Sequence, residues 1–190
     1  MSPIFTHAAI YAVISSTNLL ALEKMLSQGL DPNVCIYSIS QSKSSRIEPM
    51  PLVFYTVYKN WKEATQLLIE KKVQASIKFQ GQPLISELID KNDPESFEKL
   101  LDKGALPQEH LDHAFRMCVY RHFSAPSQAL FFMTSLIRHG FYLHSETVKS
   151  LIEELKLDSL LQTLESLQQQ EKMQLILPIA QLQIEKQKRL

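Results

Sequence analysis

The stretch PLVFYTVYKNWKEATQLLIEKK, residues 51–72, returns in altered form as PLISELIDKNDPESFEKLLDKG, residues 83–104. Without any gap, proline falls on proline, Lys-Asn falls on Lys-Asn, and LIEKK falls on LLDKG. So many like residues in one register indicate an internal repeat, which decides the architecture of a chain before any local feature does. We infer that two structural units of similar length follow one another here.

Each unit predicts two helices joined by a tight turn. The leading Pro-Leu is typical of a first helical turn, where proline is tolerated. Asn60 and Asn92 are expected to break that helix, because asparagine accepts the left-handed conformation of a tight turn. A second helix then ends in paired aliphatic residues just before Lys72 or Gly104. Neither helix can bury its apolar stripe alone, so the units are expected to stack.

The same frame fits the regions on either side. LSQGLDPN ends with a glycine, Gly29, and the preceding segment places Asn18 at the predicted turn. FFMTSLIRHG repeats this ending at Gly140, after a helix predicted in EHLDHAFRMCVYRHF. Four units are therefore expected, at residues 7–33, 51–76, 83–107 and 110–143.

The endings LSQGLDPN and LLDKGA, together with the Pro-Leu starts, resemble the ankyrin repeat, whose pattern reads TPLH-x-A…G…LL-x-x-GADxN. The resemblance covers roughly residues 7–143. The TPLH histidine is missing from every unit, asparagine replaces the turn glycine, and KKVQAS stands in place of GADxN. The resemblance implies an all-α solenoid of helical pairs, of ankyrin-repeat type, with four to five repeats and a C-terminal capping helix. A different helical-pair solenoid is the alternative.

The C-terminal quarter predicts the cap. Residues 145–167 carry an apolar stripe at helical spacing and complete an array over residues 1–167. Residues 168–190 are expected to form a C-terminal helix or tail, which Pro178 interrupts or kinks. This segment could pack back on the array, dimerise, or be recognised by a partner or a secretion machinery.

Composition bounds the function classes. The chain of 190 residues is 45% hydrophobic and 21% charged, with a formal net charge of zero, which argues against general attraction to nucleic acid or anionic membranes. The sequence contains no run of 18 apolar residues, so no membrane-spanning helix is expected. The apolar stretch near the N-terminus is not preceded by the basic segment of a secretory signal, so such a signal is not expected. The expected location is cytoplasmic.

An enlarged connection is the first candidate for a binding site. The interval between the endings Gly29 and Lys72 is longer than the interval between Lys72 and Gly104, and the excess lies in residues 34–50. The alternation in CIYSIS predicts a β-hairpin arm. Its candidate partner-binding residues are Tyr37, Ile39, Lys43 and Arg46. The alternative is a solvated insertion of no consequence, because long surface loops cost little free energy.

Aromatic residues of unit two are the second candidate. In ankyrin-like arrays the exposed side of the first helices lines the concave surface, which makes Tyr55 and Tyr58 candidates for partner contact. Trp61, the only tryptophan, is a third candidate, since tryptophan is enriched at binding hot spots; the alternative is that it is buried between two helices.

Catalytic and metal chemistry have little support in the sequence. His110 and His113 share a helix face, but no third ligand accompanies them, so no metal site is expected. Cys118, with His113 or His122, is the one candidate for a nucleophile, and no orienting residue stands at a recognisable spacing. No phosphate-binding loop or catalytic motif appears, and no cofactor is expected.

These observations predict a non-enzymatic module that binds another protein through its finger loop and concave face. Short divergent ankyrin proteins resemble effectors of intracellular bacteria, which implies possible translocation into a host cell. Two alternatives stay open: a cysteine-dependent enzyme in a helical fold, and an adaptor or inhibitor of a companion protein. The chain is expected to be a monomer, or a dimer through the C-terminal helix.

Overall fold

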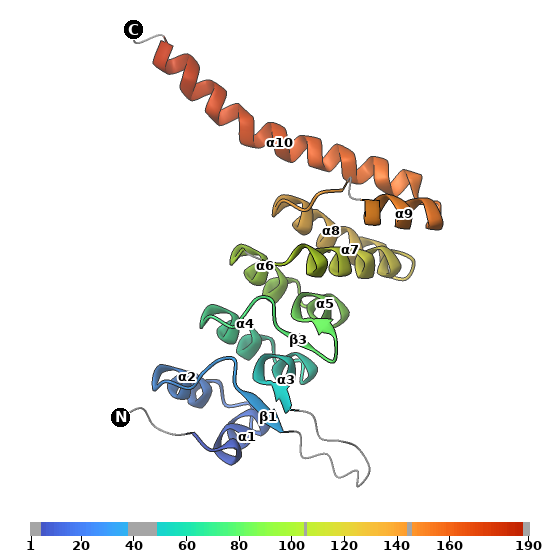
Figure 1. The fold of residues 1–190 in the computed structure, drawn as a ribbon. Coiled ribbons are helices and arrows are strands. Elements are labelled where there is room, and N and C mark those ends of the chain that lie inside the picture. The colour runs from blue at the N-terminus through green and yellow to red at the C-terminus, as the bar shows by residue number, and fades with distance from the viewer. Residues whose placement is uncertain (1–4, 38–48, 105, 144–145, 188–190) are drawn as a thin grey trace. The chain divides into compact units, whose positions relative to one another are not determined.

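The structure, a computed structural model, describes residues 5–37, 49–104, 106–143 and 146–187 (Figure 1). Over these residues the chain is mostly helical with two short hairpins, which confirms the expectation of a largely helical protein. The helices are α1 (His7–Ser15), α2 (Leu19–Ser27), α3 (Leu52–Tyr58), α4 (Lys62–Glu70), α5 (Leu84–Asp90), α6 (Pro94–Asp102), α7 (Gln108–His122), α8 (Pro126–Arg138), α9 (Glu146–Leu155) and α10 (Asp158–Gln187). The strands are β1 (Cys35–Tyr37), β2 (Pro49–Pro51), β3 (Lys78–Phe79) and β4 (Gln82–Pro83).

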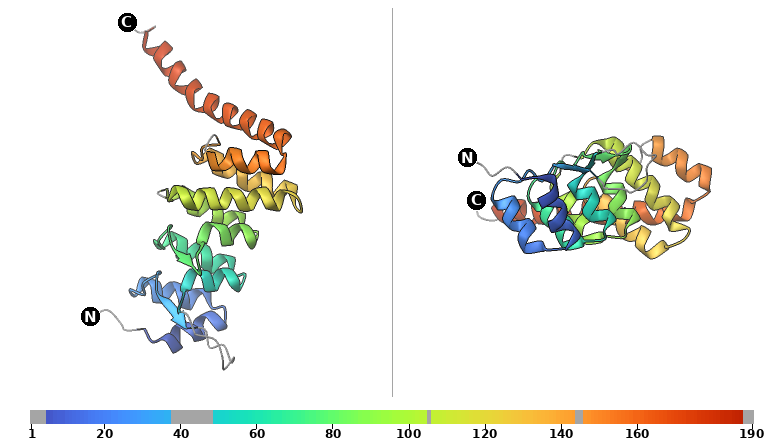
Figure 2. Two further views of the ribbon diagram at one scale, coloured as in Figure 1. Left: turned by 45° about the vertical axis from the view of Figure 1, so that its right-hand side comes forward. Right: turned by 90° about the horizontal axis from the view of Figure 1, so that it is seen from below.

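The chain divides into two compact units, Met1–Ala114 and Phe115–Leu190, and each is described by itself. Helix α7 begins in the first unit and ends in the second. The first unit contains three successive helix pairs, α1–α2, α3–α4 and α5–α6, drawn from blue to green in Figures 1 and 2. The predicted division at residue 167 falls inside α10, so it does not mark the end of an element.

One turn geometry joins the helices of each pair. Asn60 and Asn92 adopt positive φ angles of 54° and 51°, which confirms the predicted left-handed turn residues. In both turns the next residue donates its backbone N–H to a carbonyl five positions earlier, as Trp61 does to Thr56 at 2.9 Å. This Schellman pairing satisfies carbonyls that a helix end would otherwise leave unpaired.

The first pair corrects one prediction. The left-handed residue is Thr17, with φ 48°, and not Asn18. Asn18 instead caps α2, because its Oδ1 accepts a hydrogen bond from the Ala21 N–H at 3.0 Å. Asparagine is a strong N-cap, so its side chain stabilises the start of the helix rather than the turn before it. Lys156, with φ 54°, occupies the equivalent turn position between α9 and α10.

The second helices end in a related way. Gly29, Lys72, Gly104 and Gly140 all have positive φ, which confirms the four predicted endings. Where the following residue is described, it is buried and donates its N–H back to the helix, as Val73 does to Leu68 O at 3.2 Å. The endings at Gly29, Lys72 and Gly140 therefore each fix an apolar residue of the next connection in the core.

The turn geometry predicts a stability effect at Asn60. Replacing Asn60 with valine is expected to lower the free energy of unfolding of the first unit by about 1–2 kcal/mol, because a β-branched residue is strained at positive φ. Glycine at the same position is expected to change it by only a few tenths of a kcal/mol, since glycine adopts this conformation freely. Urea unfolding followed by Trp61 fluorescence measures both.

The control is Lys71→Val, at an exposed residue with φ −80°. Valine there is expected to cost about 0.5 kcal/mol or less. Equal losses for valine at positions 60 and 71 would contradict the left-handed turn.

Two hairpins connect the pairs of the first unit. β1 pairs antiparallel with β2, placing Cys35 opposite Pro51, and β3 pairs with β4, placing Lys78 opposite Pro83. Each hairpin leads directly into a first helix, where Leu52 N–H donates to Val34 O and Leu84 N–H donates to Ile77 O. The predicted hairpin within residues 34–50 is thus confirmed at its base, and residues 38–48 between its strands lie outside the described residues.

The core of the first unit lies between the helix layers. α4 packs between α2 and α6, while α3 packs against α5, so first helices neighbour first helices and second helices neighbour second helices. Asn33 ties two connections together, because its Oδ1 accepts the Gln74 N–H at 2.7 Å. The most deeply buried side chains include Ile10, Ile14, Leu22, Ile36, Leu52, Val53, Phe54, Leu68, Ile69, Leu84, Ile85, Leu88, Ile89, Phe97 and Leu100.

In the second unit, α10 packs on α8 and α9. The Phe115 and Phe141 rings stack with centroids 5.0 Å apart, and Gln168 of α10 donates to Phe141 O at 3.2 Å. Arg138 Nε and Glu171 Oε1 form an ion pair at 2.9 Å between α8 and α10.

Of the two effects predicted for Pro178, an interruption or a kink of the C-terminal segment, the interruption is not found. The helix runs continuously from Asp158 to Gln187, and Figure 1 shows it as one gently curved element. A proline removes one backbone hydrogen bond and costs about 3 kcal/mol within a helix. The glutamine, leucine and lysine residues around it are strong helix formers, which lets the helix resume beyond the missing bond.

Candidate functional site

Polar and aromatic side chains of α1, α3 and α5 form a connected surface on the first unit. We call it the first-helix face. Its members are Tyr11, Tyr55, Tyr58, Lys59, Glu87, Asp90 and Lys91. The connections arise because α3 neighbours α5 and because the Tyr11 ring of α1 meets the Tyr55 ring of α3.

The α1–α3 part of this face is built around Tyr55. The Tyr11 and Tyr55 rings meet edge to face with centroids 6.2 Å apart, and the two side chains share a hydrogen bond. Lys59 Nζ lies 5.6 Å from the centroid of the Tyr55 ring, a favourable cation–π distance. Tyr55 itself is 8% exposed, and this burial, followed by the hydrogen bond to Tyr11, raises the pKa of its hydroxyl.

The α3–α5 part is built around Tyr58, which is 40% exposed. Lys91 Nζ lies 5.6 Å from the Tyr58 ring centroid and also 3.0 Å from Asp90 Oδ2. The Tyr58 hydroxyl hydrogen-bonds the Glu87 carboxylate, and burial followed by the Glu87 charge raises the pKa of Tyr58. The Tyr58 ring also packs against Phe54 and Phe79, so this partly exposed side chain is held in place by its neighbours.

Glu87 gives this face a pH dependence. Burial and then the charge of Asp90 raise the pKa of Glu87 above its ordinary value of 4.5, although Lys91 and the Tyr58 hydrogen bond act in the opposite direction. A carboxyl whose pKa is raised by folding favours the folded state only at low pH, and this contribution is lost as pH rises through the folded-state pKa.

The expected result for Glu87→Gln is a first unit that is slightly more stable than wild type at pH 8, with a gain that shrinks towards pH 4. The amide carries no charge to desolvate and its oxygen can still accept from Tyr58. Thermal unfolding followed by Trp61 fluorescence from pH 4 to pH 8 checks this. Glu23→Gln, at an exposed residue of α2, is the control and should show no such trend. A Glu87→Gln protein less stable than wild type at pH 8 would contradict the raised pKa.

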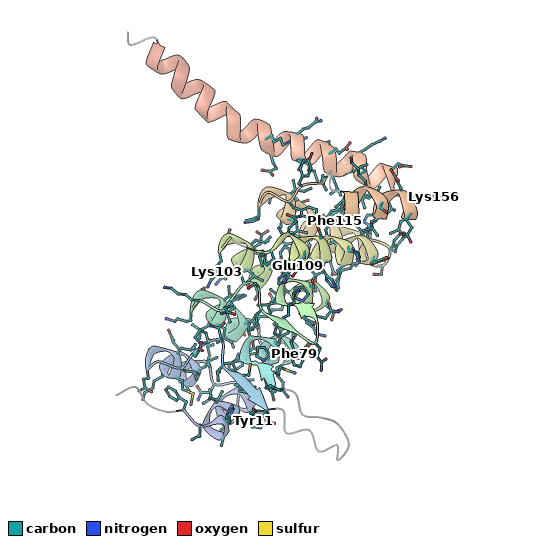
Figure 3. All side chains as sticks on the ribbon, viewed as in Figure 1. Tyr11, Phe79, Lys103, Glu109, Phe115 and Lys156 are labelled. Atoms are coloured by element: carbon teal, nitrogen blue, oxygen red, sulfur yellow. The ribbon has the colours of Figure 1, made fainter. Side chains whose placement is uncertain are left out.

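A groove lies next to the first-helix face, between α1 and β1. It has a volume of about 300 Å³ and is lined by His7, Ala8, Tyr11, Ala12, Ile36 and Tyr37. The His7 and Tyr37 rings meet edge to face at 5.3 Å, and Tyr37 is 54% exposed. Figure 3 shows Tyr11 beside β1 in this region. The groove therefore joins the hairpin base to the first-helix face through Tyr11.

The predicted binding residues separate into three groups. Tyr37 and Tyr58 are exposed and lie at the groove and on the first-helix face. Tyr55 and Trp61 are each only 8% exposed, which corrects their assignment as direct contact residues. Ile39, Lys43 and Arg46 lie outside the described residues.

The burial of Trp61 has a structural reason. Its backbone completes the α3–α4 turn, and its carbonyl accepts from the Thr65 hydroxyl at 3.1 Å. The residue is therefore fixed at the start of α4, and its side chain is buried.

Cys118 has the surroundings of a packing residue. Its side chain is fully buried in the second unit, and desolvation raises the pKa of its thiol far above the ordinary value. The thiolate is the nucleophilic form, so this environment disfavours a cysteine-dependent reaction. His113 Nδ1 is engaged with Ser86 Oγ at 2.8 Å.

The histidine pair of α7 shows no metal-binding arrangement. His110 is 1% exposed, and its Nε2 lies 3.5 Å from Glu109 Oε1. Among the described residues, no group of three or more His, Cys, Asp or Glu side chains could hold a metal ion. In the same part of the chain, no helix is both long enough and apolar enough to cross a membrane.

The remaining members of the site had no sequence signal of their own. Tyr11, Lys59, Glu87 and Lys91 look like ordinary helix residues until α1, α3 and α5 are placed side by side. The repeat register that aligns Lys59 with Lys91 was the available clue, because it puts a lysine at the same place in two units.

Comparison with known proteins does not assign the chain to a family. No family model matches it, and no curated protein or solved structure is significantly similar to it.

Proposed function

We propose that this chain is a non-enzymatic module that binds another protein, built from ankyrin-like helix pairs. The observation that carries the proposal is the first-helix face, where Tyr58 is 40% exposed and held between Lys91 and Glu87. Tyrosine held by neighbours loses little conformational entropy when a partner covers it, and tyrosine is enriched among residues that dominate binding energy.

The ankyrin-like assignment rests on the recurrence of one design. The pairs α3–α4 and α5–α6 each join a shorter helix to a longer one, are separated by a hairpin, and occupy matching positions of the sequence repeat. In three helix pairs the left-handed residue of the turn and the left-handed residue after the second helix are the same number of positions apart. These residues are Thr17 and Gly29, Asn60 and Lys72, and Asn92 and Gly104. Stacked units of this kind make extended surfaces suited to binding.

The structural setting also favours binding over catalysis. The face is built on helices rather than on long loops, so it is largely formed before a partner arrives. Its charged groups are paired with rings or with each other: Lys59 with Tyr55, and Lys91 with Tyr58 and Asp90. These pairings hold the charged groups in fixed positions, which would orient a partner protein on the face.

Affinity capture with the purified full chain tests the proposal. Wild type, Tyr58→Ala and Lys91→Glu are immobilised and exposed to bacterial and eukaryotic lysates, and bound proteins are quantified by mass spectrometry. We expect one partner to be retained by wild type and reduced at least about tenfold by either variant, the usual size of a hot-spot effect. Lys24→Glu, the same charge change at an exposed residue of α2, is the control and should capture normally.

The source of the partner separates the versions of this proposal. A eukaryotic partner supports an effector translocated into a host cell, whereas a bacterial partner supports a cytoplasmic adaptor or inhibitor. If Tyr58→Ala, Lys91→Glu and Lys24→Glu all capture the same proteins as wild type, the first-helix face is not the binding surface.

A further inference from the structure

The groove between α1 and β1 has the size and chemistry of a side-chain pocket. Its lining is predominantly apolar, and its volume of about 300 Å³ is at the lower end of the range for sites that hold small molecules. Ala8 and Ala12 are exposed and small, which leaves space along α1, while the buried Ile36 closes the groove on the strand side. A space of this kind fits one aliphatic or aromatic side chain.

Lys59 supplies a nearby positive charge that is not paired with any carboxylate of the described residues. Among the described residues, Lys78 pairs with Glu109, Lys91 with Asp90 and Lys99 with Glu70, but no carboxylate pairs with Lys59. Its ammonium group lies over the Tyr55 ring and its side chain is exposed. The ring holds the cation in position, and the solvent side of the cation can accept an anionic group.

The distance between these two features limits what can occupy both. The Tyr11 ring lies 6.2 Å from the Tyr55 ring, and Lys59 Nζ lies 5.6 Å from the Tyr55 ring. The distance from the Tyr11 ring, at the edge of the groove, to the Lys59 ammonium group is therefore no greater than the sum of these two distances. An extended chain advances roughly 3.3 Å per residue, so at most roughly four residues are needed to span this distance.

We propose that the groove and Lys59 together bind a short extended segment of the partner protein, with one large apolar side chain in the groove and, no more than about four residues away, an Asp or Glu at Lys59. This inference rests on the proposed function, since it names the kind of segment that the module recognises. The apolar groove matches the anchor, and the exposed ammonium group of Lys59 matches the carboxylate by charge.

Selection of linear peptides tests the inference. A phage-displayed library of random dodecapeptides is selected on the immobilised full chain, and the affinity of an enriched peptide is measured by fluorescence anisotropy. We expect enrichment of a large apolar residue with an acidic residue at one fixed spacing of about four residues or fewer. Ala12→Arg fills the groove from an exposed helix position and should weaken binding at least tenfold.

Lys59→Glu should weaken binding about fivefold or more, because an attractive pair becomes a repulsive one. Replacing the acidic residue of the peptide with glutamine should weaken binding to wild type but not to Lys59→Glu. The matched controls are Ser15→Arg on α1 and Lys24→Glu on α2, both exposed and outside the groove, and each should bind within twofold of wild type. Circular dichroism and Trp61 fluorescence confirm that each variant is folded.

Several results would overturn the inference. One is enrichment of peptides without an acidic residue at fixed spacing, and another is equal affinity for Lys59→Glu. Failure of wild type to enrich any peptide is a third, and self-association that Ala12→Arg abolishes is a fourth, since a second copy would then occupy the groove.

If partner capture depends on Tyr58 and Lys91 but not on Ala12 or Lys59, the inference fails while the proposed function stands. If capture depends on none of the four, both fail.

Discussion

Replacing Phe97 with alanine is expected to lower the free energy of unfolding of the first unit by about 3–5 kcal/mol, the usual cost of truncating a fully buried phenylalanine. Phe97 has no exposed surface and lies on α6, which packs against both α4 and α5. The substitution therefore leaves a cavity where two helix pairs meet. Because whole domains are stable by only about 5–15 kcal/mol, this loss is a large fraction of the total.

Trp61, the only tryptophan, lies in the first unit and reports its unfolding directly. In urea, the midpoint should fall by roughly 2 M or more for a unit of this size. Leu20→Ala on α2 is the control, because Leu20 is 78% exposed and its truncation should change stability by less than about 0.5 kcal/mol. Similar midpoints for the two variants would mean that α6 is not packed as described.

Cys118 is expected to react with a thiol reagent at least about a thousandfold more slowly than Cys35 in the native protein. Cys35 is exposed on β1, whereas Cys118 is fully buried and reacts only when its surroundings open. Burial also raises the pKa of the Cys118 thiol, so little thiolate is present while the side chain stays buried. Local opening of a packed core costs several kcal/mol, which accounts for the factor.

Ellman's reagent at pH 8 measures both thiols in one sample. One equivalent should be released rapidly and the second only after urea is added. The variants Cys35→Ser and Cys118→Ser assign the two phases. A Cys118 that reacts in the native protein as fast as Cys35, or faster, would contradict its burial and restore the cysteine-dependent enzyme as an explanation.

The sequence predicted the helix pairs because their boundaries depend on local chemistry. Asn60, Asn92 and Gly104 occupy conformations that few residue types adopt, so their recurrence identified the turns directly. Asn18 was misplaced by one position, because asparagine suits both a left-handed turn and an N-cap.

The composition of the site could not be predicted in the same way. Tyr55, Tyr58 and Trp61 look equivalent in sequence, yet two are buried and one is exposed. Which of them reaches solvent depends on how neighbouring helices cover α3, a relation between residues far apart in the chain. The pairing of Lys91 with Tyr58 and the groove beside Tyr11 depend on the same long-range packing.

Site-specific photo-crosslinking tests the central claim, that a partner protein covers the first-helix face, most directly. Benzoylphenylalanine replaces Tyr58 in one protein and Leu20, which is exposed on α2, in another. After irradiation in lysate, a covalent adduct with one partner is expected from position 58 and not from position 20. Adducts of that partner from position 20 alone, or a captured partner without any adduct at position 58, would contradict the account.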